Sequence, residues 1–251
     1  MNNKTSLYIV LMGLIICGCA TSTKLRKASE IGEISNVQSL LSSFWSYKLD
    51  VNAKDKEDGS TSLILASKKG YTDITRLLLA NGANVDDVNI FGCTALMHAC
   101  AYGHIEIARL LLNTNADVSI KTKGDLWTSL MYAASEGHSD IIELLLGNNA
   151  DIDSKSISSR TALMIASKYG HYSTVELLLD RGADINAIQK DGKTALMIAS
   201  RVGHFKIVQL LLTKGADANI RDIYGETALM MATQRGYTEI EKLIIYHGME
   251  L

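Results

Sequence analysis

The chain has 251 residues, and its 25 Lys and Arg nearly balance its 27 Asp and Glu, which leaves a formal net charge of −2. Nucleic-acid-binding domains usually carry a strong excess of basic residues on one face, so this balance argues against a nucleic-acid partner. The absence of proline argues against a proline-rich linker. Four cysteines are too few and too unevenly spaced for a disulfide framework.

Residues 1–18 have the pattern of an export signal that is removed from the mature protein. Lys4 supplies a positive charge, and the apolar run over residues 7–16 is about half the length that a membrane-spanning helix needs. The run ends in Ile16-Cys17-Gly18-Cys19, which resembles the lipobox of bacterial lipoproteins. The resemblance implies cleavage after Gly18 and attachment of a diacylglycerol to the thiol of Cys19. The alternative is an ordinary secretory signal with incidental cysteines.

Residues 19–24 are then expected to form a short lipidated tether. Acyl chains contribute about 0.8 kcal/mol per buried methylene, so two or three chains hold a protein stably on a bilayer. Ala20 follows the cysteine, and the resemblance to lipoproteins implies that a residue other than Asp at this place allows transfer to the outer membrane. We therefore expect a lipid-anchored protein of the bacterial cell envelope, on the periplasmic or surface face of the outer membrane.

Residues 25–55 are predicted to be a degenerate, capping copy of the repeat that follows. The small and apolar positions of that repeat are matched by Ala28, Gly32, Val37, Leu40 and Leu41. Polar residues stand between them, as a terminal repeat needs because its outer face has no neighbour to cover it.

Residues 56–251 contain six copies of one pattern, in which a Thr is followed by small and apolar residues, a Gly and a Leu-rich run. The copies are anchored at Thr61, Thr94, Thr128, Thr161, Thr194 and Thr227, spaced by 33, 34, 33, 33 and 33 residues. A period near 33 is typical of helix–turn–helix units with a protruding turn, which bury their apolar faces only by stacking on their neighbours. The repeats therefore predict an all-α solenoid and leave no room for a separate catalytic domain.

The copy over residues 89–119 shows what each position is expected to do. Thr94 caps the first helix, which Gly103 ends. Leu110 and Leu111 belong to the apolar stripe of the second helix. A residue in the left-handed conformation then closes the second helix, a role that Gly or Asn can fill. These closing residues are Gly82, Asn115, Asn149, Gly182, Gly215 and Gly248.

The copies resemble the ankyrin repeat, whose pattern is D-x-x-G-x-T-P-L-H-x-A-A-x-x-G-H followed by I-V-x-L-L-L-x-x-G-A-D-x-N. The resemblance covers residues 56–251 and implies an ankyrin-repeat solenoid of stacked helix–turn–helix units with protruding turns. Two positions depart from the family. The family Pro is replaced by Ser or Ala, and the family His by Ile64 and then by methionines, whose flexible thioethers are expected to pack there. The methionines are Met97, Met131, Met164, Met197 and Met230.

The other chemistry-bearing residues are expected to be structural. A ladder of one histidine per repeat, formed by His104, His138, His171 and His204, does not converge on one metal ion, and we expect these rings to hydrogen-bond within their turns. No disulfide is expected between Cys93 and Cys100, because it would bend a helix. Phosphate-binding loops and nucleophile elbows are absent from the sequence. We therefore expect no metal, no cofactor and no enzymatic activity.

Aromatic residues stand at positions that stacking does not dictate, namely the turn before each Thr and the end of each first helix. By the resemblance these positions line the concave face, on which ankyrin arrays bind partners. The candidate partner-binding residues at these positions are Phe91, Tyr102, Trp127, Tyr169 and Tyr224, and His98 and Tyr132 stand nearby, at the fourth residue after the Thr. Aromatic residues are over-represented among binding hot spots, although each could instead pack between adjacent turns.

The turn over residues 124–127 carries the one-residue insertion and is the best single candidate for a specialised contact. Lys190 and Lys193, on a later turn, are expected to tolerate replacement by Ala. We expect a monomeric, membrane-anchored lipoprotein that acts as a protein–protein interaction scaffold. One alternative is an immunity or protective factor that binds and inhibits or chaperones an exported toxin or enzyme. A host-directed effector is a weaker alternative, because a lipid anchor retains the protein on the producing cell.

Overall fold

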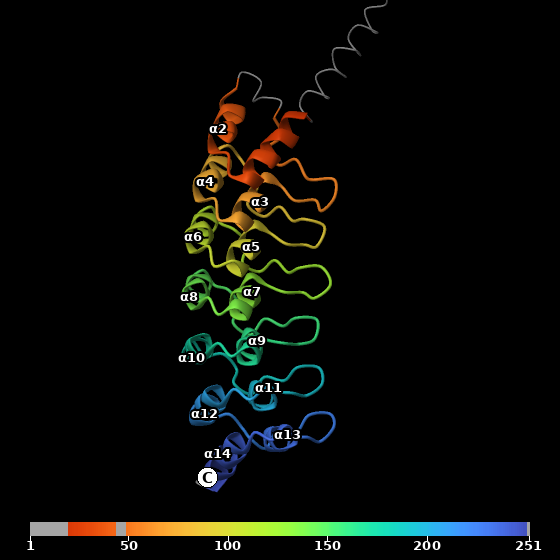
Figure 1. The fold of residues 1–251 in the computed structure, drawn as a ribbon, viewed down its shortest axis with the longest axis vertical. Helices are drawn as coiled ribbons and strands as arrows, with labels where there is room; N and C mark the ends of the chain where they lie inside the picture. Colours follow the sequence, from red (N-terminus) through yellow and green to blue (C-terminus); the bar gives the residue numbers. More distant parts are fainter. Residues whose placement is uncertain (1–19, 44–48, 250–251) are drawn as a thin grey trace, which may run out of the picture. The chain divides into compact units, whose positions relative to one another are not determined.

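The computed structural model describes residues 20–43 and 49–249 of the chain (Figure 1). The predicted signal segment and the predicted lipidation site Cys19 lie outside the described residues. None of the helices in the described ranges is both long and apolar enough to cross a membrane.

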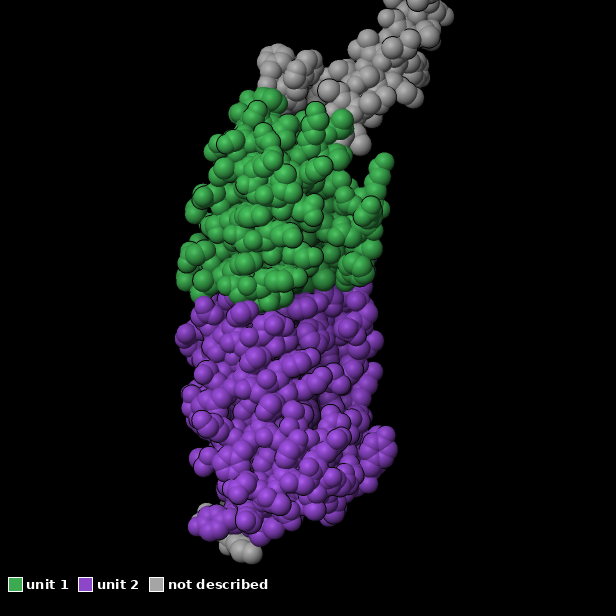
Figure 2. Space-filling view, in the orientation of Figure 1, with its two compact units in different colours: residues 1–117 green, residues 118–251 purple. Residues whose placement is uncertain are grey.

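The chain divides into two compact units, residues 1–117 and residues 118–251 (Figure 2). Unit 1 contains a helical segment over residues 20–31, followed by α2 (Ile34–Ser42), α3 (Ser62–Lys69), α4 (Thr72–Ala80), α5 (Ala95–Ala101) and α6 (Ile105–Asn113). Unit 2 contains α7 (Ser129–Glu136), α8 (Ser139–Gly147), α9 (Ala162–Tyr169), α10 (Tyr172–Asp180), α11 (Ala195–Val202), α12 (Phe205–Thr213), α13 (Ala228–Arg235) and α14 (Thr238–Met249).

Each unit is a stack of helix pairs. In unit 2 the first helices α7, α9, α11 and α13 pack in one row, and the second helices α8, α10, α12 and α14 pack in another. Unit 1 repeats the arrangement, with α3 against α5 and with α4 between α2 and α6. A turn protrudes before each first helix, and we call these turns fingers (Figure 1). The predicted all-helical ankyrin-type solenoid is confirmed, and the described residues form no strands.

The six repeated threonines begin the first helices as predicted. Each Thr is the N-cap residue, and its hydroxyl accepts a hydrogen bond from the backbone N–H three residues later, at 3.2 Å in the pair Thr94–Met97 and 3.5 Å in the pair Thr161–Met164. This bond satisfies one of the free N–H groups at the start of a helix. The other capping pairs are Thr61–Ile64, Thr128–Met131, Thr194–Met197 and Thr227–Met230. The first four methionines of the series are buried as expected, whereas Met230 is exposed.

The predicted left-handed residues close five second helices, and one prediction was wrong. Gly82, Asn115, Asn149, Gly182 and Gly215 all have positive φ. Gly248 instead lies inside α14, which continues to Met249. In the copies closed by Asn115, Gly182 and Gly215, the next residue is a buried Ala. In the last copy this position is Met249 instead of Ala.

The start of unit 1 differs from the expected tether. Residues 20–24 are helical and continue into the segment that ends at residue 31. Ser22, Leu25 and Ala28 are buried at helical spacing, and Ser22 Oγ accepts a hydrogen bond from the Asp50 backbone N–H at 3.2 Å. The first helix of the capping repeat therefore begins before residue 25, because the apolar stripe extends into the expected tether.

The histidine ladder connects successive repeats rather than closing its own turns. His171 Nε2 lies 2.8 Å from the Ser135 carbonyl oxygen of the preceding repeat, and the same contact joins His104 to Lys68 and His204 to Lys168. The His171 ring covers Gly137, where a Cβ would lie 2.6 Å from Nδ1. The role is structural, as expected, but the predicted bonding partner was wrong. Sequence spacing alone could not show that the ring crosses to the neighbouring repeat.

Candidate functional site

The finger before α5 in unit 1 presents Phe91 to solvent. Asn89 closes this finger, because its backbone N–H bonds the Cys93 carbonyl at 3.1 Å and its Oδ1 accepts from the backbone N–H groups of Phe91 and Cys93. The Ile90 N–H donates to the Asp58 carbonyl of the preceding finger at 2.9 Å. The Phe91 side chain is 59% exposed on this fixed backbone. A rigid and exposed aromatic residue loses little entropy when a partner covers it.

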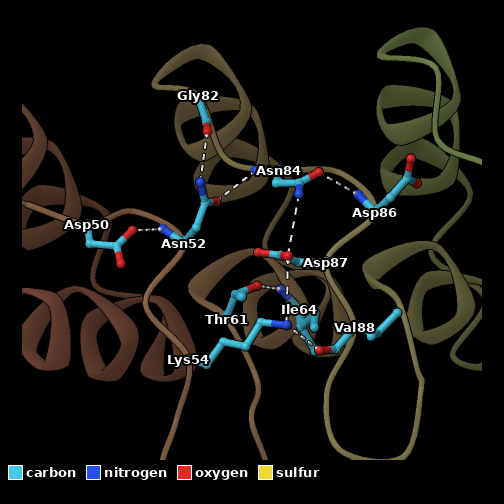
Figure 3. Close-up of polar contacts among 10 residues, drawn as sticks. All are labelled: Asp50, Asn52, Lys54, Thr61, Ile64, Gly82, Asn84, Asp86, Asp87 and Val88. Atoms are coloured by element: carbon cyan, nitrogen blue, oxygen red, sulfur yellow. Dashed lines mark hydrogen bonds and ion pairs between the residues drawn. The ribbon is translucent and has the colours of Figure 1, made fainter.

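A polar ladder in the loops between repeats sets the spacing of the unit 1 fingers (Figure 3). Asn52 Oδ1 accepts from the Asn84 backbone N–H at 2.8 Å, and Asn84 Oδ1 accepts from the Asp86 backbone N–H at 3.2 Å. Lys54 Nζ donates to the Val88 carbonyl at 2.8 Å. These loop residues were not among the predicted site residues, although their recurrence in the D-x-N pattern was a usable signal.

His98 and Tyr102 are brought together on α5. Their ring centroids lie 6.5 Å apart, and the Tyr102 ring is exposed. His98 is half-buried, and burial together with the nearby positive charge of Lys68 lowers the pKa of His98 to about 4. His98 is therefore neutral at neutral pH and supports the Tyr102 ring from one side. Tyr102 is the more accessible of the two predicted contact residues.

In the inserted turn of unit 2, the more exposed side chain is that of Leu126 and not that of Trp127, the predicted contact residue. Trp127 is half-buried, and its ring packs edge-on against Tyr132 with centroids 5.1 Å apart. Two hydrogen bonds of 2.9 Å close the base of the turn. The Thr122 backbone N–H donates to the Trp127 carbonyl, and the Trp127 backbone N–H donates to the Thr122 hydroxyl oxygen. Leu126 has a positive φ of 57° and points an exposed side chain outward. The residue type of Leu126 does not predict its exposure, because the exposure depends on the unusual backbone conformation.

Two tyrosines of unit 2 are largely exposed and stand beside lysines. Tyr169 ends α9, and Lys168 Nζ lies 4.9 Å from its ring centroid. Tyr224, on the finger before α13, is 74% exposed and lies 5.5 Å from Lys193 Nζ. Both rings are available to a partner, in the positions that the repeat pattern predicts.

Lys193, which we expected to tolerate replacement by Ala, is buried. Its side chain is only 8% exposed and forms ion pairs with Asp191 at 2.8 Å and with Asp222 of the next finger at 3.1 Å. Burial alone would raise the pKa of Asp222, but backbone N–H donors and Lys193 hold it below its usual value. Burial likewise opposes the charge on Lys193, and the two carboxylates raise the pKa of Lys193 nonetheless. Lys190 is exposed.

Exposed aliphatic side chains at the fingers were missed by the sequence reasoning. They are Ile90 in unit 1 and Ile157, Ile188 and Ile223 in unit 2. The Ile157 N–H donates to the Asp125 carbonyl at 2.8 Å, and the Ile223 N–H donates to the Asp191 carbonyl at 3.0 Å. Isoleucine at a turn position was a usable signal, because turns favour Gly, Asn, Asp and Ser.

Over residues 20–43 and 49–249, no three His, Cys, Asp or Glu side chains are grouped so that they could hold a metal ion. Cys93 and Cys100 are not joined by a disulfide.

Comparison with known proteins identifies the repeat. The family model "Ankyrin repeats (3 copies)" matches residues 25–124, 119–189 and 186–251. Among solved structures, the human ASB11 ankyrin repeat domain is similar with a TM-score of 0.79 at 27% identity, covering 89% of this chain and 96% of that one. The ankyrin repeat domain of Bcl-3 has a TM-score of 0.76 at 29% identity, covering 88% and 97%. No curated protein matched the sequence.

Proposed function

Because the chain belongs to the ankyrin-repeat family, whose repeats generally mediate protein–protein interaction, we propose that it is an interaction scaffold without catalytic activity. The observation that carries this proposal is the set of exposed aromatic and aliphatic side chains on the fingers. Their backbones are fixed by hydrogen bonds to the preceding finger, as in the pair Ile223–Asp191. Apolar residues held rigidly in water suit contact with another protein.

We further propose that the scaffold is tethered to the bacterial outer membrane by lipid on Cys19. The support is the Ile16-Cys17-Gly18-Cys19 sequence after a short apolar run. Replacing Cys19 by Ser removes the acyl acceptor, so the protein should leave the membrane fraction or accumulate with its signal uncleaved. Cys17→Ser is the matched control, because it removes a thiol two residues away and should retain both the anchor and labelled fatty acid. Labelling of the Cys19→Ser protein at the parent level would contradict the lipoprotein proposal.

Partner binding can be tested by photo-crosslinking in intact cell envelopes. A photoreactive phenylalanine analogue is placed at Phe91 or at Tyr224, two exposed finger positions. The control position is Tyr172, an exposed aromatic residue at the start of α10, away from the fingers. The finger variants should crosslink to a discrete protein that the control does not capture. Equal products at all three positions, or none at the finger positions, would count against a binding role for the fingers.

A further inference from the structure

Three cationic residues of unit 2 form a row at the ends of adjacent first helices. Lys168, Arg201 and Arg235 lie in the last turns of α9, α11 and α13, which pack side by side in that order. We call these residues the basic row. No ion pair within the described part of the chain involves any of them. Other cations of the unit, such as Lys214 and Arg181, do have carboxylate partners.

Helix electrostatics account for only part of this pattern. A cation near a helix C-terminus is stabilised by the negative end of the helix dipole. Yet α7 in the same unit ends with Glu136, so the position does not require a cation. Arg160 adds a fourth positive charge from the finger that precedes α9, where the dipole of a helix C-terminus does not explain it, and it donates to Gln189 Oε1 at 3.0 Å.

The finger position before the capping Thr faces the same surface as the basic row. In the last repeat this position is Glu226, which accepts a hydrogen bond of 2.6 Å from Gln234 in the last turn of α13. Arg160 occupies the equivalent position before Thr161. The surface thus combines charges from fingers and helices, with cations in excess.

Exposed apolar side chains accompany the row. Tyr169 directly follows Lys168, and Val202 directly follows Arg201, and both are exposed. Two successive repeats therefore present the same pair, a cation and an apolar residue. The inter-repeat loops of this unit carry acidic residues at Asp151, Asp153, Asp184 and Asp217.

We propose that the basic row binds an extended, acidic segment of a partner protein, with a carboxylate at about every third residue. Packed helices lie about 8–10 Å apart. A segment in the extended polyproline II conformation rises about 3.1 Å per residue with about three residues per turn, so every third side chain points the same way and three residues match one repeat. The carboxylates then meet Lys168, Arg201 and Arg235 in turn, and an apolar side chain between them reaches Tyr169 or Val202. This inference rests on the proposed scaffold function and specifies its partner.

A protein segment fits this surface better than a nucleic acid does. Three cations, one per repeat and interleaved with Tyr169 and Val202, match sparse carboxylates and apolar side chains. A nucleic-acid backbone carries a far denser charge, about one per 1.7 Å of duplex. Glu136, in the repeat before that of Lys168, and Glu226, in the same repeat as Arg235, would also repel a continuous polyanion.

The test uses the full chain purified in detergent and a fluorescein-labelled peptide of four Glu-Leu-Ser triplets. Fluorescence anisotropy should detect binding that weakens as NaCl is raised from about 0.05 to about 0.3 M, because salt screens exposed charges. A control peptide has the same composition with its glutamates adjacent, and should bind more weakly. Arg201→Glu and, separately, Arg235→Glu should each weaken binding about tenfold or more. Lys206→Glu, an equal charge change at an exposed position on the second helix α12, should leave binding unchanged.

Several results would overturn the inference. The first is equal affinity for the two peptides. The second is a loss of affinity with Lys206→Glu as large as with the row variants. The third is unchanged affinity in both Arg201→Glu and Arg235→Glu when circular dichroism shows native helix content. Tighter binding of a single-stranded DNA oligonucleotide or of anionic lipid vesicles would also overturn it. If the finger variants crosslink to a partner but the peptide does not bind, only the basic-row inference is refuted. Peptide binding without any crosslinked partner refutes the proposed scaffold function.

Discussion

Replacing Lys193 by Ala should destabilise unit 2, because it leaves the Asp222 carboxylate buried without its counter-charge. The Asp222 side chain is 0% exposed, and Lys193 Nζ lies 3.1 Å from its Oδ2. Removing one partner of a buried pair costs about 3–5 kcal/mol. Asp222 keeps two backbone donors, the N–H groups of Tyr224 and Glu226 at 2.9 and 3.0 Å. We therefore expect a cost of about 3 kcal/mol, at the lower end of that range.

The effect should depend on pH with a defined sign. The pKa of Asp222 is lowered by folding, so its contribution is present above its ordinary value of 3.8 and is lost as pH falls through the folded value. The pKa of Lys193 is raised by folding, so its contribution is present below 10.5 and is lost as pH rises through the folded value. The difference between parent and variant should be largest between these limits.

Urea unfolding followed by circular dichroism at pH 7 measures the cost, and hydrogen exchange at the finger amides shows whether the loss is local. Lys190→Ala, an exposed change three residues away, should cost less than about 0.5 kcal/mol. In an Asp222→Asn background, Lys193→Ala should cost less than about 1 kcal/mol, because no buried charge is left behind. If Lys193→Ala and Lys190→Ala unfold at the same urea concentration, the reasoning about the buried pair is refuted.

Four other changes have defined outcomes. Thr161→Ala removes the N-cap bond to α9 and should cost about 1 kcal/mol in urea unfolding. Leu211→Ala opens a cavity at a side chain that is fully buried, and should cost about 2–5 kcal/mol in the same measurement. Folding lowers the pKa of His98 from 6.5 to about 4, so stability should fall by up to about 3 kcal/mol as pH drops through this window. His98→Gln should flatten that pH dependence, and an unchanged slope would assign it to other groups. Trp127→Ala removes the edge-on contact with Tyr132 and should cost about 0.5–1.5 kcal/mol of stability beyond the lost burial of the ring, as measured by thermal melting. Partner affinity is measured on the same variant. Loss of affinity without loss of stability would show that the ring contacts the partner.

The repeating period predicted the features that depend on local sequence. Thr94 caps its helix and Asn115 adopts the left-handed conformation because both roles are decided within a few residues. Gly248 stands at the same repeat position as the glycines that close other second helices, so the sequence predicted the same role, and this prediction was wrong. The next residue is Met249, whereas the other copies have Ala there.

The features that sequence could not provide depend on contacts between repeats. Lys193 meets Asp222, which is 29 residues later, and nothing in either local pattern indicates that the two fingers share a buried ion pair. The exposure of Leu126 follows from its positive φ rather than from its residue type. Among the candidate site residues, Tyr169 and Tyr224 stand at positions that the repeat leaves unconstrained, and their side chains are exposed. Their contact with a partner stays a prediction. Trp127 was less well anticipated, because its ring packs on Tyr132.

The ring that covers a glycine of the preceding repeat also determines where the chain can change length. His171 over Gly137 and His204 over Gly170 hold successive helix pairs in one register, and a residue added within a helix would displace the ring. The finger before Thr128 has already absorbed an added residue, yet Thr122 still closes its base, and Asp125 still accepts from Ile157. Foreign peptide segments grafted at the tip of this finger should therefore be displayed without disturbing the helices, whereas the same segments inserted into α9 should not be tolerated.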